Sequence, residues 1–228
     1  MYYHLTIKVL PHINKMIISF SEETFNLNDD DLFVFFTDSF LENLSLKGDL
    51  LKKTIMYKYI LNNRERTLVC PLIKNVMGDI EVIWPAFKLP FRKYPICVYL
   101  YAVILYLSSN LSMRKVCTKV RKIFGITGFC HSTLSRSLKK LSFIADQIGR
   151  VLHQHEISDI HEPNQDHKSS LSSLRVNPSI QKHFNPFRNE QHLKLRTLLN
   201  PILDSCQSAP FSNHINVLFY KKYKKFLL

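Results

Sequence analysis

Hydrophobic residues in the first 90 positions fall in short runs that are separated by turn-forming residues, a pattern typical of β-strands. The predicted strands are Tyr3–Leu10, Lys15–Phe20, Lys53–Leu61, Arg66–Cys70 and Ile80–Trp84. The first two strands would form a hairpin through Pro11–Asn14. Asn62-Asn63 marks a tight turn between the third strand and the fourth.

One helix is predicted within this region, because the spacing of the hydrophobic residues changes there. Asp29, Asp30 and Asp31 suit a helix N-terminus, where carboxylates meet the positive end of the helix dipole. Large hydrophobic residues then recur at helical spacing, at Phe33, Phe36, Phe40, Leu41 and Leu44. An extended link over Trp84–Tyr94, punctuated by Pro85 and Pro90, leads out of this part of the chain.

A helix over about residues 95–108 follows this link. Ile96–Leu107 is an unbroken run of twelve apolar or aromatic residues, and Pro95 suits the first turn of a helix. A membrane span needs about 20 apolar residues, so the run is better explained as a helix buried in a protein core.

Two amphipathic helices are predicted beyond this buried helix. The first begins after Ser112 as N-cap, and its apolar stripe consists of Val116, Val120, Ile123 and Phe124. The second begins at Ser132 as N-cap and turns Leu134, Leu138 and Leu141 inward. Gly125 and Gly128 break the chain between them, and Cys130 is expected to be buried in this turn.

Polar residues dominate positions 153–190, which predicts a linker over about 155–180 and a helix over Glu190–Leu199. The polar stretch places His153, His155, His161 and His167 among carboxylates, so it is either a solvated polar segment or a transition-metal site. Cations and aromatic residues alternate over Leu218–Phe226. This tail would contact phosphates, lie on an anionic membrane surface or fray.

These elements predict an α+β protein with three parts. Residues 1–90 form a small β-containing N-terminal part with hairpins, and residues 91–152 form a helical domain of helix-turn-helix type. Residues 153–228 form a linker and a loosely ordered, basic C-terminal extension.

Charge is concentrated in the helical part of the sequence. The whole chain carries a formal charge of +13, but residues 1–87 have a net charge of −2 and residues 88–150 one of +11. Such a block attracts a polyanion, and nucleic acid is the first candidate. Residues 22–49 have a net charge of −7 and either form a solvated face or fold over the basic block.

The other motifs narrow the class of protein. Five cysteines without a C-x-x-C pair are typical of reduced thiols in a cytoplasm, and the N-terminus does not have the pattern of a signal peptide. Glycine-rich phosphate loops and spaced catalytic triads are not found in the sequence. We therefore expect neither an enzyme nor a resident metal or cofactor.

The helical block is the candidate functional region, because residues 112–141 contain eight basic residues and no acidic one. The candidate DNA-binding residues are Arg114, Lys115, Lys119, Arg121, Lys122, Ser132, Thr133, Ser135, Arg136, Lys139 and Lys140. A short helix N-terminus with hydroxyls and one arginine suits base edges in a major groove, while flanking cations suit phosphates. The alternative is a three-helix packing unit with a solvated cationic face.

The sequence also resembles a known family. Trp84-PAFKLPFRKYP, the apolar run, LSMRKV and HSTLSRSLKKL are similar to the N-terminal region of bacterial insertion-sequence transposases and of a related uncharacterised bacterial domain family. The resemblance covers about residues 50–141 and implies a zinc ribbon followed by a helix-turn-helix. Only Cys70-Pro71 of the ribbon ligands is present, with Ile73 at a second ligand position, which implies a ribbon without metal.

The family also carries a catalytic domain with three spaced carboxylates, and only 87 residues follow Leu141 here. We therefore expect a non-catalytic protein that binds double-stranded DNA, derived from or associated with a transposase, in the cytoplasm and without membrane attachment. It would act as a homodimer or beside a separate transposase subunit. The alternatives are the DNA-binding subunit of a split transposase and a protein-interaction module.

Overall fold

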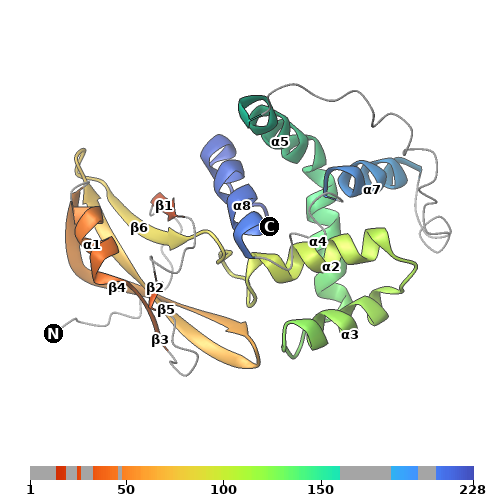
Figure 1. Ribbon diagram of the computed structural model, residues 1–228, viewed down its shortest axis with the longest axis horizontal. Helices are drawn as coiled ribbons and strands as arrows, with labels where there is room; N and C mark the ends of the chain where they lie inside the picture. The colour runs from red at the N-terminus through yellow and green to blue at the C-terminus, as the bar shows by residue number, and fades with distance from the viewer. Residues whose placement is uncertain (1–13, 19–24, 27–32, 46–47, 160–185, 200–208) are drawn as a thin grey trace.

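The computed structural model describes residues 14–18, 25–26, 33–45, 48–159, 186–199 and 209–228. The fold is α+β, as predicted, with a sheet at one end of the molecule and a group of helices at the other (Figure 1). The strands are β1 (Asn14–Ile18), β2 (Phe25–Asn26), β3 (Phe33–Phe36), β4 (Gly48–Leu61), β5 (Arg64–Asn75) and β6 (Ile80–Pro85). The helices are α1 (Asp38–Ser45), α2 (Ile96–Ser108), α3 (Met113–Ile123), α4 (His131–Phe143), α5 (Ala145–Asp159), α7 (Pro186–Leu199) and α8 (Ala209–Tyr223).

A long hairpin of β4 and β5 forms the centre of the sheet. The predicted turn is confirmed, because Asn62 and Asn63 connect the two strands with φ values of 51° and 56°. Asparagine tolerates this left-handed conformation, which matches the twist of the strands on either side. β4 lies along one edge of β5, and β3 and β6 pair with successive parts of its other edge.

The helix predicted to run through Phe33 and Phe36 is wrong at its beginning. Residues 33–36 form β3, in which Val34 and Phe36 are buried while Phe33 and Phe35 are exposed. Four large hydrophobic residues in succession satisfy a strand of period two as well as a helical stripe, and pairing with β5 decides between them. The helix begins only at Asp38, in α1.

At the edge of the sheet, β1 pairs in parallel with β6, from Asn14 opposite Glu81 to Ile18 opposite Pro85. The hairpin predicted for the N-terminus therefore has its second strand in the sheet, but beside β6. Its first strand, Tyr3–Leu10, lies outside the described residues.

The predicted buried helix is confirmed as α2, in which eleven of thirteen residues are buried. Helices α3 and α4 both pack against it, so α2 is the platform on which the amphipathic helices lie. In the described part of the chain, none of the helices has the length and hydrophobicity to cross a membrane.

The helical core extends beyond the predicted three helices. α5 covers the start of the predicted linker, and residues 160–180 of that linker lie outside the described residues. The predicted helix Glu190–Leu199 is confirmed within the longer α7, which buries Leu195 and Leu199.

The basic and aromatic tail is largely the last helix, α8, together with a short segment that turns back onto the core. Phe219, Leu227 and Leu228 are buried, and Phe226 packs against Trp84 with ring centroids 5.7 Å apart. A frayed terminus therefore does not describe these residues. In the described parts of the C-terminal extension, burial of apolar side chains gives order that composition alone did not predict.

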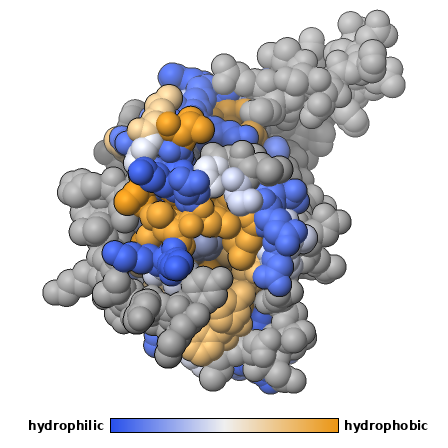
Figure 2. Space-filling model, turned by 90° about the vertical axis from the view of Figure 1, so that its left-hand side faces the viewer, coloured by the Kyte–Doolittle hydropathy of each residue, from blue (hydrophilic) through white to orange (hydrophobic). Residues whose placement is uncertain are grey.

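Two clusters of buried residues result, one in the sheet and one among the helices. They meet where the chain leaves β6, and Phe226 packs against both. At the sheet end of the molecule, hydrophobic surface forms a central strip between hydrophilic margins (Figure 2).

Candidate nucleic-acid interface

Helix α3 is anchored by a narrow apolar stripe and a capped start. The Oγ of Ser112 accepts a hydrogen bond from the backbone N–H of Lys115 at 3.4 Å, which confirms the predicted N-cap. Val116, Cys117 and Val120 are buried. The predicted stripe is therefore too wide at its end, because Ile123 is 48% exposed.

The remaining surface of α3 is cationic. Its exposed basic residues are Arg114, Lys115, Lys119, Arg121 and Lys122. Arg121 donates a hydrogen bond to Thr118 Oγ1, and Thr118 Oγ1 donates to the carbonyl of Arg114, so one side of the helix carries a connected polar row.

The turn between α3 and α4 is longer than in most helix-turn-helix units, and the sheet holds its shape. The N–H groups of Asn62 and Asn63, at the tip of the β4–β5 hairpin, donate to the carbonyls of Phe124 and Gly125. Gly125 has a φ of +50°, and a Cβ atom there would lie 3.2 Å from Asn62 Cα. The glycine thus permits both the turn and the close approach of the hairpin.

A second contact fixes the far end of this turn. The hydroxyl of Tyr94 donates to the carbonyl of Thr127, and its oxygen would lie 3.3 Å from a Cβ atom at Gly128. The ring of Tyr94 packs against Phe129, which is buried. The turn is therefore held from two sides before any ligand arrives.

The N-cap of helix α4 lies two residues earlier than the predicted Ser132. It is Cys130, whose carbonyl accepts the N–H groups of Thr133 and Leu134 at 3.0 and 3.1 Å, so Ser132 lies inside the first turn. A cap of the Ser type is favoured when its side chain binds a backbone N–H, and this structure places Ser132 Oγ against Cys130 Sγ instead, at 3.0 Å. Leu134, Leu138 and Leu141 point into the core as predicted.

Cys130 is exposed, so the prediction that it is buried in the turn is wrong. Hydrogen bonds from Ser132 and Thr133, side chain and backbone, lower the pKa of its thiol to about 6. The thiol therefore ionises at neutral pH, at the N-terminus of the helix predicted to read DNA.

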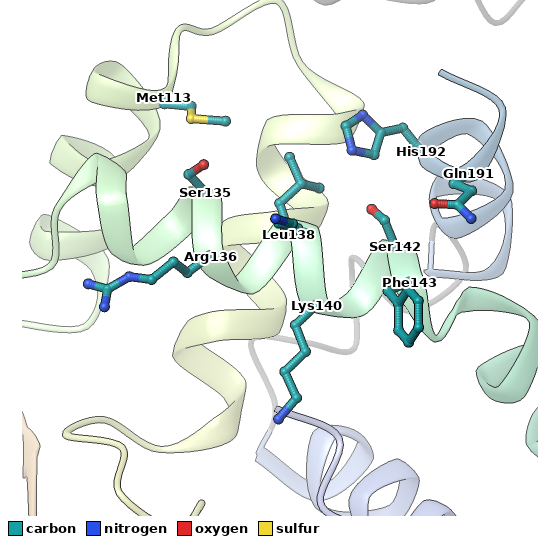
Figure 3. Close-up of a pocket in the computed structure, with 10 residues that line it drawn as sticks. Met113, Ser135, Arg136, Leu138, Lys140, Ser142, Phe143, Gln191 and His192 are labelled. Carbon is teal, nitrogen blue, oxygen red and sulfur yellow. The ribbon is translucent and has the colours of Figure 1, made fainter. Parts of the chain in front are cut away.

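The exposed side chains of α4 leave the helix in two directions. Arg136 extends toward the N-terminal end, where its Nε donates to the carbonyl of Ser132 at 3.2 Å. Lys140 and Phe143 leave a common side of the helix (Figure 3). Burial and the charge of Arg92 lower the pKa of Lys140, so this lysine lies beside another cation and away from the helix N-terminus.

Helix α7 packs against the C-terminal half of α4. Gln191 and buried His192 border a cavity there with Ser142 and Lys139 (Figure 3). In the first turns of α4, His131, Ser132, Ser135 and Arg136 are exposed and Thr133 is half-buried. The N-terminal half of α4 is thus the part open to a partner.

Helix α7 also neutralises the acidic residue of the basic block. Asp146 is the single carboxylate of residues 88–150, and its side chain binds Lys194. The hydrogen bond and charge of Lys194 lower the pKa of Asp146. Sequence reasoning missed this pair because the two residues are 48 positions apart.

Cys70 and Ile73, where the resemblance implies a ribbon without metal, are both fully buried in β5. Burial raises the pKa of the Cys70 thiol. Within the described ranges, no group of three or more His, Cys, Asp or Glu side chains is placed to hold a metal ion. Of the histidines near the predicted linker, His153 lies exposed on α5, and His161 and His167 lie outside those ranges.

Comparison with protein-family models, with curated proteins and with solved structures gives no match for this chain.

Proposed function

We propose that this chain binds duplex DNA without catalysing a reaction on it, with the N-terminal half of α4 in the major groove and the cations of α3 on the phosphates. One observation carries the proposal. All eight basic residues of positions 112–141 are exposed, on two helices that pack against each other, in a segment without a carboxylate. Exposed cations on a rigid support attract a polyanion and orient it.

Arg136 is the candidate base-reading residue. It is the one long donor in the open first turns of α4, and a guanidinium can pair with both O6 and N7 of guanine. Thr133 and Ser135 flank it with hydroxyl groups. Lys119 and Lys122 on α3 are candidates for phosphate contacts, which would set the register of the protein on the duplex.

The likeness of residues 50–141 to the N-terminal region of insertion-sequence transposases supports a transposase-derived or transposon-associated role, in the cytoplasm of a bacterium. The α2–α3–α4 packing is compatible with that likeness, since α4 crosses a preceding cationic helix on an apolar platform. A homodimer or a separate transposase subunit would supply the second half of a DNA site.

A binding selection on random duplex DNA, followed by affinity measurements across a salt series, tests the proposal. Arg136→Ala should weaken binding to the selected site by about 1–3 kcal/mol and relax preference at one base pair. Lys119→Ala should weaken all duplexes alike and reduce the salt slope by about one unit.

Lys53→Ala is the matched control, because Lys53 is an exposed lysine on β4, in the sheet. It should change neither affinity nor the salt slope. If Arg136→Ala weakens every duplex equally, Arg136 contacts phosphate and the base-reading role is wrong. If none of these variants changes binding at any salt concentration, the cationic face is a solvated surface and the proposal fails.

A further inference from the structure

Three cavities lie in sequence along the molecule, and each shares lining residues with the next. The first, of about 500 Å³, lies between α4 and α7 and ends at Lys140 and Phe143 (Figure 3). These two residues also line the second cavity, of about 570 Å³. The second cavity ends at Pro90, Phe91 and Arg92, which also line the third, of about 310 Å³. The cavities are therefore neighbours along one path.

Each boundary between neighbouring cavities carries a phenylalanine that projects into solvent. Phe91 is 85% exposed and Phe143 is 82% exposed, and within the described residues no phenylalanine is more exposed. An isolated exposed apolar residue needs no explanation, but two aromatic rings on consecutive ridges of one path form a repeated feature. Such rings offer flat apolar faces to a ligand.

The loop that carries Phe91 has a strained conformation that hydrogen bonds support. Phe91 has a φ of 57°, a left-handed conformation that is rare for a bulky residue. Lys88 is buried, and its Nζ donates to the carbonyls of Leu89 and Arg92 on either side of Phe91. The indole of Trp84 donates to the carbonyl of Lys88. The bonds of Lys88 and Trp84 thus hold the loop in the conformation that exposes Phe91. Strained residues that are held in this way cluster at functional sites.

The path is cationic along its length. Arg92, Lys140 and Lys225 line the central cavity, and Lys93 lines the third. Lys58 and Lys88 also border the third cavity, but Lys58 binds Glu65 at 2.7 Å and Lys88 is buried against backbone carbonyls. Among the described residues that line the three cavities, none is aspartate or glutamate. The lowered pKa of Lys140, caused by burial and then by Arg92, is consistent with cations that lie close together and lack an anion between them.

We propose that this path binds a single strand of nucleic acid, whose bases stack on Phe91 and Phe143 while its phosphates lie over Arg92, Lys140 and Lys225. Aromatic platforms alternating with cations are what an unpaired strand requires, because every base has a flat face and every link carries a charge. A base pair in a duplex has no free face to offer. The first cavity also reaches Met113, Ser135 and Arg136, at the edge of the proposed duplex-binding face, but Phe91 and Phe143 lie outside α3 and the first turns of α4.

The test measures the affinity of the full chain for a labelled oligothymidylate of about 15 nucleotides. Phe91→Ala and Phe143→Ala should each weaken binding by about 5-fold or more, because stacking of one base on an aromatic ring contributes at least that much. Phe91→Tyr should retain the affinity. Phe91→Leu should behave like Phe91→Ala, since leucine keeps apolar bulk but has no ring face.

Met77→Ala is the matched control, because Met77 is also 85% exposed but lies in the β5–β6 turn. It should leave the affinity unchanged. An abasic strand of the same length should bind equally well to the Phe91 and Phe143 variants and to the wild type. Quenching of 2-aminopurine in the oligonucleotide should decrease with Phe91→Ala and again with Phe143→Ala. An oligouridylate arm shows whether RNA or DNA is preferred.

The proposal is overturned if both alanine variants bind the single strand as the wild type does. It is also overturned if they lose polyglutamate binding to the same extent, because the path would then be a site for acidic protein. Duplex affinity of the Phe91 and Phe143 variants should stay unchanged. Because those measurements use residues outside α3 and the first turns of α4, loss of the duplex function and loss of this site are distinguishable.

Discussion

The sheet and the helices differ in charge and in what they present to a partner, although each has a core of its own. Residues 1–87 have a net charge of −2, whereas residues 88–150 have one of +11. The helices therefore carry the cations proposed to bind nucleic acid. The sheet instead contributes the hairpin tip that holds the α3–α4 turn and the strand, β6, that leads to the Phe91 loop.

Under the proposed function, the sheet supports the α3–α4 turn and the helices carry most of the cations proposed to contact nucleic acid. A seven-residue turn from Phe124 to Cys130 would be poorly defined by its own sequence. The backbone hydrogen bonds from Asn62 and Asn63 define it from outside. Preorganised support of this kind lowers the entropy lost when a ligand binds.

The largest effect is expected at Asn216, in α8, where the helices join the exit of the sheet. Its Nδ2 donates to the carbonyl of Ala86 at 2.8 Å, and its Oδ1 accepts from the N–H of Leu227 at 3.2 Å. Asn216, Ala86 and Leu227 are all buried, so their polar groups would lose a partner without gaining water. Asn216→Leu should therefore lower the free energy of unfolding by about 3 kcal/mol. Urea denaturation measures the change. Lys221→Ala, an exposed position on the same helix, is the control and should have little effect. A loss below about 1 kcal/mol for Asn216→Leu would contradict the view that Asn216 joins α8 to the exit of the sheet.

A smaller loss is expected from Gly125→Ala, at the contact between hairpin and turn. Alanine would adopt an unfavourable positive φ, and its Cβ would press on the Asn62 backbone. We expect a loss of about 2 kcal/mol. Gly78→Ala is the control, because Gly78 also has a positive φ, of +87°, but its nearest neighbour is the flexible end of Lys74. Equal losses at the two glycines would show that the hairpin contact contributes nothing.

Element type and burial were predictable wherever a pattern had a single solution. Ile96–Leu107 is too apolar for anything but a core and too short for a membrane, and Asn62-Asn63 suits few conformations besides a tight turn. Phe33–Phe36 satisfied two periodicities, and only its pairing with β5 decided the outcome.

For the candidate site, the sequence predicted which cations are exposed but not how they are grouped. Arg136 and Lys140 are neighbours on one helix, yet Lys140 lies beside Arg92 through the packing of a distant loop. Contacts such as Asp146 with Lys194, or Asn62 with Phe124, join residues far apart in sequence and leave no local pattern. The cavity that Phe91 and Phe143 both line likewise joins residues far apart in sequence and leaves no local pattern.

Lys88 links stability to pH at the boundary between the two regions. Burial lowers its pKa from 10.5 to about 8, so between these values the unfolded chain binds more protons than the folded one. Stability due to this lysine therefore rises with pH in that window. Relative to Lys88→Met, the wild type should gain about 1–2 kcal/mol between pH 7.5 and 9.5. Urea denaturation of both proteins across this range measures it, and a constant difference would contradict the lowered pKa.

The last prediction concerns thiol reactivity and has the smallest effect on stability. It compares two cysteines, one buried and one exposed. Cys70 is fully buried in the sheet, where burial raises the pKa of its thiol. Cys130 is exposed at the start of α4, where hydrogen bonds, first from Ser132 and then from Thr133, lower the pKa of its thiol to about 6. Only the thiolate is nucleophilic, so the folded protein should react with iodoacetamide at Cys130 and spare Cys70.

The rate of alkylation at Cys130 should rise with a midpoint near pH 6, measured by mass spectrometry in a Cys206→Ser background. Ser132→Ala should move the midpoint upward, and Thr133→Val should move it less, because the Ser132 hydrogen bond is the largest cause of the shift. Since the folded pKa lies below the unfolded value of 9.0, the ionised thiol stabilises the folded state above pH 9, and this contribution is lost as pH falls toward 6. A midpoint near 9 in the wild type would mean that the first turn of α4 does not hold Ser132 and Thr133 against the thiol. The proposed reading geometry of Arg136, which depends on the same turn through its bond to the Ser132 carbonyl, would then need revision.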